Sequence, residues 1–206
     1  MKNELFAFQK KAIREISEKI ETANKYFQLD HKPQVIAFQA PTGSGKTIIM
    51  TAVIENMFFE NPDSIFVWLS DSPQLNEQSM EKIILKADRI RPNQCEIVSD
   101  ESFDREILDD GHIYFLNTQK LSKSSRLVSH GDNRTYTIWE TLSNTESEKS
   151  DRLYVIIDEA HRGMRNDRDR AKANTIMQKF IKGSPQEHLA PMPIVIGMSA
   201  TDERFR

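Results

Sequence analysis

The stretch Ala40-Pro41-Thr42-Gly43-Ser44-Gly45-Lys46-Thr47 decides the fold of this chain: it is a glycine-rich turn that ends in a lysine and a threonine. A short apolar run, Val35-Ile36-Ala37-Phe38, precedes it and is typical of a strand that is covered on both faces. Apolar residues then recur at helical spacing until Asn61-Pro62 stops the pattern. The glycine loop therefore joins the carboxyl end of a predicted strand to the start of a predicted helix.

The glycine loop has the composition of a polyphosphate site. The small residues 43–45 allow the backbone amides to curl toward one point, and the following helix adds the positive end of its dipole. Lys46 is expected to reach the β- and γ-phosphates, and the Thr47 hydroxyl to coordinate Mg²⁺. The sequence thus predicts a bound nucleoside triphosphate, held by Pro41, Thr42, Gly43, Ser44, Gly45, Lys46 and Thr47.

Two acids follow a later apolar run, Val155-Ile156-Ile157. Asp158, at the end of this predicted strand, is expected to hold the magnesium ion beside the γ-phosphate. Glu159 is expected to orient and deprotonate the attacking water. The candidate catalytic residues of an enzyme that splits a triphosphate are Lys46, Asp158 and Glu159.

A third element, Ser199-Ala200-Thr201, follows the apolar run 194–197. The ring of His161 is expected to relay the state of the nucleotide toward this element. We therefore predict coupling roles for His161, Ser199 and Thr201. The alternative is that His161 satisfies a local hydrogen bond and that the two hydroxyls belong to an ordinary turn.

Apolar runs of strand length alternate with helical patterns along most of the chain, which predicts an α/β fold with a mostly parallel central sheet. The glycine loop, the acidic pair and the third element each follow the carboxyl end of a predicted strand, the edge at which open α/β sheets bind ligands. The segment 122–150 is polar apart from Ile138-Trp139, and we expect it to be an excursion from the core with room for a short helix. The predicted strands are 35–38, 65–69, 96–98, 113–116, 153–157 and 194–197, and predicted helices cover about 3–27, 46–60, 72–87 and 173–181.

The composition is that of one large globular domain of 206 residues with a net charge of −3, which neither requires nor excludes nucleic acid as a partner. Cys95 is the single cysteine, so neither an internal disulfide nor a cysteine-built zinc site is expected. No apolar stretch approaches the ~20 residues that cross a bilayer. These features predict a cytoplasmic protein without a membrane partner.

The three motifs, in this order, resemble those of the DEAD/DEAH-type helicases and translocases of helicase superfamily 2. The resemblance implies a P-loop NTPase fold, a RecA-like three-layer sandwich that uses ATP and Mg²⁺. The stretch 5–13 looks like the family segment whose glutamine reads adenine, which places that role on Gln9 within an N-terminal unit of residues 1–33. A glutamine amide both donates and accepts hydrogen bonds, as an adenine edge requires. The alternative is an exposed helix glutamine.

Within this superfamily, Leu75-Asn76-Glu77-Gln78, Thr118-Gln119-Lys120-Leu121 and the stretch 158–163 look most like the motor subunits of type III and related type I restriction enzymes. This resemblance implies a DNA translocase of a restriction system, with a methyltransferase or specificity subunit as partner. Family loops at these positions touch the nucleic-acid backbone, which implies contacts from Ser72, Gln78, Thr118 and Gln119. The alternative is that these residues only cap helices and end strands. The cations Lys120, Lys123 and Arg126 are better explained as a solvated surface.

Family members carry a second RecA-like domain whose arginines complete the ATP site, and no segment of residues 1–206 supplies it. An arginine finger contributes about 10³–10⁵ in rate, so we expect the chain alone to bind Mg–ATP and to hydrolyse it very slowly. No nuclease motif is visible. Two other functions use the same residues: an RNA helicase, because backbone contacts tolerate both polymers, and a non-catalytic module that is gated by nucleotide. Glu159 argues against the second, since a sensor needs no base.

Overall fold

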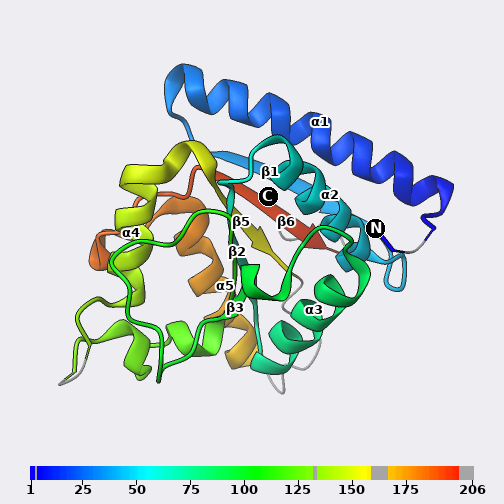
Figure 1. Ribbon diagram of the computed structural model, residues 1–206. Coiled ribbons are helices and arrows are strands. Elements are labelled where there is room, and N and C mark those ends of the chain that lie inside the picture. The colour runs from blue at the N-terminus through cyan, green and yellow to red at the C-terminus, as the bar shows by residue number, and fades with distance from the viewer. Residues whose placement is uncertain (3, 132–133, 159–166, 200–206) are drawn as a thin grey trace.

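The computed structural model describes residues 1–2, 4–131, 134–158 and 167–199. Its centre is a six-stranded sheet in which every pairing is parallel, with the strand order β1-β6-β5-β2-β4-β3 (Figure 1). This arrangement confirms the predicted parallel α/β fold. The strands are β1 Gln34–Gln39, β2 Ile65–Ser70, β3 Cys95–Ile97, β4 Ile113–Asn117, β5 Leu153–Ile157 and β6 Ile194–Ser199.

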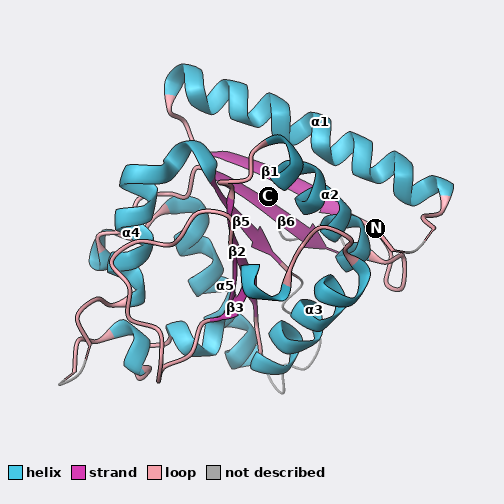
Figure 2. Cartoon of the chain, viewed as in Figure 1, coloured by secondary structure: helices cyan, strands magenta, loops and turns pink. Residues whose placement is uncertain are grey.

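Helices cover both faces of the sheet, which makes three layers (Figure 2). Helices α1 (Ala7–Asp30), α2 (Lys46–Glu60) and α3 (Pro73–Lys86) pack against one face, and α4 (Ile138–Lys149) and α5 (Asp167–Lys182) against the other. Alternation along β2 shows why two cores form. Phe66 and Trp68 point into the first core, whereas Val67 and Leu69 point into the second, because successive strand residues face opposite sides.

Helix ends follow local signals in the sequence. The Ser72 hydroxyl accepts a hydrogen bond from the Leu75 amide and caps α3, with Pro73 at the first helical position, as its sequence predicts. Helix α1 starts later and ends later than expected, because the Gln9 side chain accepts a hydrogen bond from the Phe6 amide at its start and the left-handed His31 (φ 54°) ends the helix. Among the described residues, no helix is long and apolar enough to cross a membrane.

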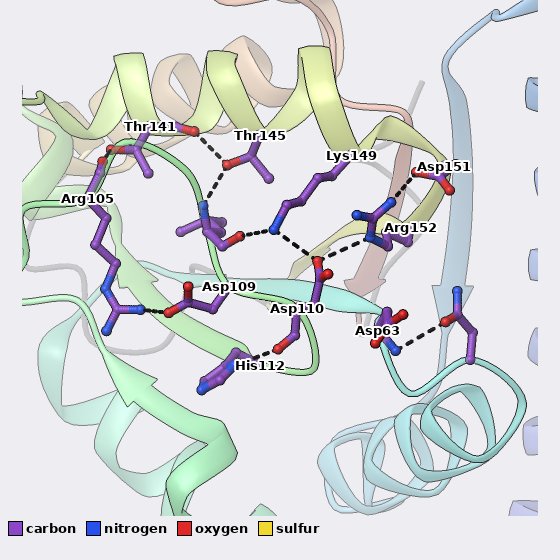
Figure 3. Close-up of polar contacts among 12 residues, drawn as sticks. Asp63, Arg105, Asp109, Asp110, His112, Thr141, Thr145, Lys149, Asp151 and Arg152 are labelled. Atoms are coloured by element: carbon purple, nitrogen blue, oxygen red, sulfur yellow. Dashed lines mark hydrogen bonds and ion pairs between the residues drawn. The ribbon is translucent and has the colours of Figure 1, made fainter.

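The segment 122–150 is not the excursion that its polar composition suggested. Helix α4 packs Ile138, Trp139 and Leu142 into the second core. Its polar side holds the irregular segment 104–112 (Figure 3): Thr141 and Lys149 donate hydrogen bonds to backbone carbonyls of that segment, and the Thr145 hydroxyl accepts one from the Leu108 amide. These polar groups therefore have hydrogen-bond partners inside the protein. The many polar residues of segment 122–150 wrongly suggested that it is exposed to solvent.

Candidate functional site

Three neighbouring strands bring the predicted motifs to one edge of the sheet. Strand β6 lies between β1 and β5, and Gln39 is level with Ser199 in the register while Ile157 is level with Gly197. The Ala40 amide donates to the Ser199 carbonyl over 3.1 Å, so the start of the glycine loop is joined to the end of β6. Adjacent strands lie about 4.8 Å apart, which separates β1 from β5 by roughly 10 Å.

The backbone of the glycine loop requires glycine at two positions. Gly43 and Gly45 both have φ +83°, in the left-handed region that side chains disfavour. They differ in their surroundings. A Cβ on Gly43 would meet nothing within 4 Å, whereas a Cβ on Gly45 would lie 2.8 Å from Nε2 of Gln9. Gly45 also caps α2, so the loop passes directly into the first turn of that helix.

The N-terminus of α2 is suited to an anion. Its first turn contains no acidic residue and its N-cap is a glycine without a side chain, so the positive end of the helix dipole is not offset there. Nζ of Lys46 lies 3.1 Å from the Ala40 carbonyl and donates to it across the loop. Thr47 is half-buried in the same turn. The Pro41 carbonyl accepts from the Ser44 amide at 3.1 Å, which closes the loop on itself.

Gln9 connects α1 to the glycine loop. Its side chain is 6% exposed. Nε2 donates to the Ser44 carbonyl at 3.1 Å, and Oε1 accepts from the Phe6 amide at 3.0 Å. Gln9 is therefore not an exposed helix residue, and one N–H and one lone pair of its amide remain for a ligand.

Asp158 stands directly after β5 and is half-buried. Its amide donates to the Leu69 carbonyl at 2.8 Å, which anchors it to the end of β2. Ser199, at the end of β6, is 2% exposed. Glu159, His161 and Thr201 lie outside the described residues.

Comparisons with known proteins agree with this geometry. The family model for the type III restriction enzyme, res subunit, matches residues 2–204. The chain belongs to this family. This family match bears out the resemblance to helicase superfamily 2 that the order of its motifs indicates, and the fold is that of a RecA-like domain. A search of curated proteins gave no match.

Solved structures share the fold of this family member at low identity. The SWI2/SNF2 ATPase core of Sulfolobus solfataricus in complex with dsDNA has a TM-score of 0.59 at 16% identity, over 98% of this chain and 33% of that one. The UvsW helicase of bacteriophage T4 has a TM-score of 0.50 at 13% identity, over 97% and 53%. A nuclease-deletion mutant of the type ISP restriction-modification enzyme LlaGI, in complex with a DNA substrate mimic, has 0.52 at 13%, over 97% and 18%. The chain thus spans about half or less of each of these three structures.

The residues present fit a nucleotide with a magnesium ion. Gly45 has no Cβ, and a Cβ there would clash with the Gln9 side chain. No acidic residue in the first turn of α2 offsets the positive end of the helix dipole. The described part of the chain has no cluster of three His, Cys, Asp or Glu side chains that could hold a metal by itself. Mg²⁺ beside a triphosphate needs only one or two carboxylates and takes its remaining ligands from phosphate and water. The Asp158 carboxylate and the Thr47 hydroxyl are oxygen donors of this kind, and their joint role as metal ligands stays a prediction.

The residues that are expected to touch nucleic acid follow β2 and β4, in the other half of the same sheet edge. Ser72 caps α3, and Gln78 and Gln119 are exposed on α3 and on the short helix η2 (Thr118–Leu121). Thr118 is 4% exposed, and its hydroxyl donates to the Asp71 carbonyl at 3.4 Å. It therefore ties the turn after β4 to the turn after β2, and a contact between Thr118 and nucleic acid stays a prediction.

Sequence reasoning missed a buried polar pair beneath Ser72. The Ser70 hydroxyl lies 3.0 Å from the Ser72 carbonyl and 2.6 Å from Oδ1 of Asn76, and neither Ser70 nor Asn76 is exposed. These contacts hold the turn between β2 and α3 from its buried side. The available signal was the spacing of Asn76, Ser79 and Ile83, which places two polar residues on the buried side of α3.

Proposed function

We propose that this motor domain binds Mg–ATP and belongs to a DNA-dependent translocase or helicase, the restriction subunit of a restriction-modification system. The nucleotide part of the proposal rests on one observation. The glycine loop and Asp158 follow the ends of β1 and β5, the two strands on either side of the strand that ends at Ser199. The family match supports the restriction role. DNA is favoured over RNA because two of the similar structures are described as DNA complexes.

The residues of the chain have distinct tasks in this proposal. Bound Mg–ATP supplies the phosphoanhydride bond that is broken and the cation that offsets its negative charge. The amides of residues 43–45 donate to phosphate oxygens, and the Lys46 ammonium adds a positive charge. Thr47 and Asp158 hold the metal ion. Glu159 orients a water molecule and accepts its proton as the water attacks.

Coupling to nucleic acid follows from the arrangement of the edge. The Ser199 carbonyl accepts a hydrogen bond from the Ala40 amide at the start of the glycine loop. We propose that this contact passes movement of the loop to the end of β6. We assign the passage of this signal to Ser199, Thr201 and His161. A second RecA-like domain would complete the ATP site, and without it we expect slow hydrolysis. A methyltransferase or specificity subunit is the further partner that we propose.

The test is ATP turnover by the full-length protein with duplex DNA, with RNA and without polymer. The proposal expects stimulation by DNA. Stimulation by RNA alone would make the protein an RNA helicase, and no turnover with either polymer, despite ATP binding, would favour a nucleotide-gated binding module.

Glu159→Gln tests the proposed base in the same assay. It should keep ATP affinity and lose turnover, because an amide cannot accept the proton of water. Asp151→Asn, at the amino end of β5, is the matched control and should retain turnover. Full turnover in Glu159→Gln would show that another residue is the base.

A further inference from the structure

The carboxyl edge of the sheet continues past β2 to β4 and β3, where an ion pair joins two turns. Asp100 follows β3, and Lys120 lies in η2 directly after β4. Nζ of Lys120 is 2.6 Å from Oδ1 of Asp100, and the two side chains are 35% and 21% exposed. The nucleotide motifs occupy the opposite half of the same edge, on β1, β6 and β5.

The Lys120–Asp100 contact is ionic. Oδ1 of Asp100 is shielded from solvent, and no hydrogen-bond donor is aligned with it in the described part of the chain. Both backbones are fixed independently. The Asp100 carbonyl accepts from Nη2 of Arg134 at 2.8 Å, and the Lys120 amide donates to Oδ1 of Asn117 at 3.1 Å. The long lysine side chain is therefore the part that can change partner while both turns stay in place.

Lys120 lies where the proposed function puts nucleic acid. It adjoins the exposed Gln119, and the Thr118 hydroxyl ties this turn to the one that precedes Ser72. Two more cations, Lys123 and Arg126, are exposed nearby in sequence. Phosphate is the anion that would approach such a surface, because lysine and arginine supply the charge in sequence-independent binding. Asp100 already neutralises one of these charges.

We propose that Asp100 competes with nucleic-acid phosphate for the Lys120 ammonium and so limits the affinity of this surface for DNA. The inference rests on the proposed function, since it presumes that DNA lies along this half of the edge. In the paired state Lys120 releases no counterion from DNA, because its charge is already balanced. Loss of the carboxylate would make the ammonium available to one phosphate.

The test is binding of a fluorescein-labelled 25-base-pair duplex DNA by the protein and by Asp100→Asn, measured by anisotropy across a chloride series. Asp100→Asn should bind roughly 1.5- to 5-fold more tightly at low salt, the range given by a partly exposed ion pair. The slope of log K against log[salt] should steepen by up to about 0.9, which corresponds to one additional phosphate contact. A purely structural role for Asp100 would not steepen this slope.

Two further variants distinguish the effect of breaking the Lys120–Asp100 ion pair from the general effect of removing one negative charge. Asp63→Asn makes the same charge change on an exposed acid between α2 and β2, at the amino edge of the sheet, and should leave the slope unchanged. Lys120→Ala should weaken binding more in the Asp100→Asn background than in the native protein, because only there is the ammonium available.

The outcomes distinguish the proposed competition of Asp100 for Lys120 from the proposed DNA-binding function. Native DNA binding with an unaltered Asp100→Asn slope overturns the competition and leaves the proposed function intact. An equal loss from Lys120→Ala in both backgrounds does the same, since Lys120 would then contact phosphate despite Asp100. Failure of both the native protein and Asp100→Asn to bind duplex DNA overturns the competition together with the DNA-binding function.

Discussion

Nε2 of Gln9 donates a hydrogen bond to the Ser44 carbonyl over 3.1 Å, and this contact joins the first turn of α1 to the glycine loop. Because Oε1 accepts from the Phe6 amide at the same time, a single side-chain amide fixes both segments. Its remaining N–H and lone pair suit the adenine-reading role that the resemblance to superfamily 2 helicases implies for Gln9. The position of α1 and the shape of the loop should therefore depend on each other.

Alanine substitutions at the two left-handed glycines test this dependence. Gly43→Ala should lower the free energy of unfolding by about 1 kcal/mol, the cost of a left-handed alanine. Gly45→Ala carries the same cost and also displaces the Gln9 amide, which removes a hydrogen bond that contributes about 1 kcal/mol. Urea unfolding measures both variants. In a Gln9→Ala background the difference between them should shrink, and equal losses in the native background would contradict the coupling.

The acid stability of the protein should depend on Asp110. Burial opposes ionisation of this carboxyl, but hydrogen bonds from Arg152 and Lys149 outweigh it and hold its pKa below the usual range (Figure 3). A depressed pKa stabilises the fold above the unfolded-state value, about 3.9, and this contribution is lost as the pH falls through the folded pKa. Because the pair is partly exposed, we expect at most about 1 kcal/mol.

Urea unfolding of Asp110→Asn between pH 7 and pH 3 measures this contribution. The native protein should be the more stable at pH 7, and the two should converge as the pH falls below about 4. A gap between native and Asp110→Asn that persists to pH 3 would refute the assignment.

Cys95 should be unreactive in the folded protein. Burial raises the pKa of its thiol to about 12. At pH 8 the thiolate, which is the reactive form, should be at least about 100-fold scarcer than in an unfolded chain. The rate of reaction with a disulfide reagent, followed with and without urea, measures the ratio. Equal rates in the folded and unfolded states would show an accessible, ordinary thiol.

The raised pKa of Cys95 also predicts how stability depends on pH. Ionisation of this thiol should not lower the free energy of unfolding below about pH 8.5, and should lower it progressively above that pH.

Sequence patterns correctly predicted that the glycine loop and Asp158 follow strand ends, because the signals for both are local. The glycines, Lys46 and the strand before them lie within a dozen residues, and the strand run before Asp158 identifies a second strand end. Parallel pairing then brings these ends together without further information.

The other features depend on contacts between distant segments. Thr141 and Thr145 lie in the segment that its polar composition predicts to be an excursion from the core, yet they bond to residues 36 and 37 positions away. Lys120 was interpreted as part of a solvated cluster, whereas Asp100, which neutralises it, follows a different strand. No periodicity in the sequence encodes either contact.

The central claim is that Lys46 and its loop hold Mg–ATP at the edge between β1 and β5, and thermal unfolding with ligand tests it most directly. Mg–ATP at a hundred times its Kd should stabilise the native protein by ~2.7 kcal/mol, which raises Tm by roughly 5–10 °C for a domain of this size. Lys46→Ala should lose most of that rise, while Lys82→Ala, an exposed α3 lysine, should keep it. A Lys46→Ala protein that shows the full native rise would contradict the claim.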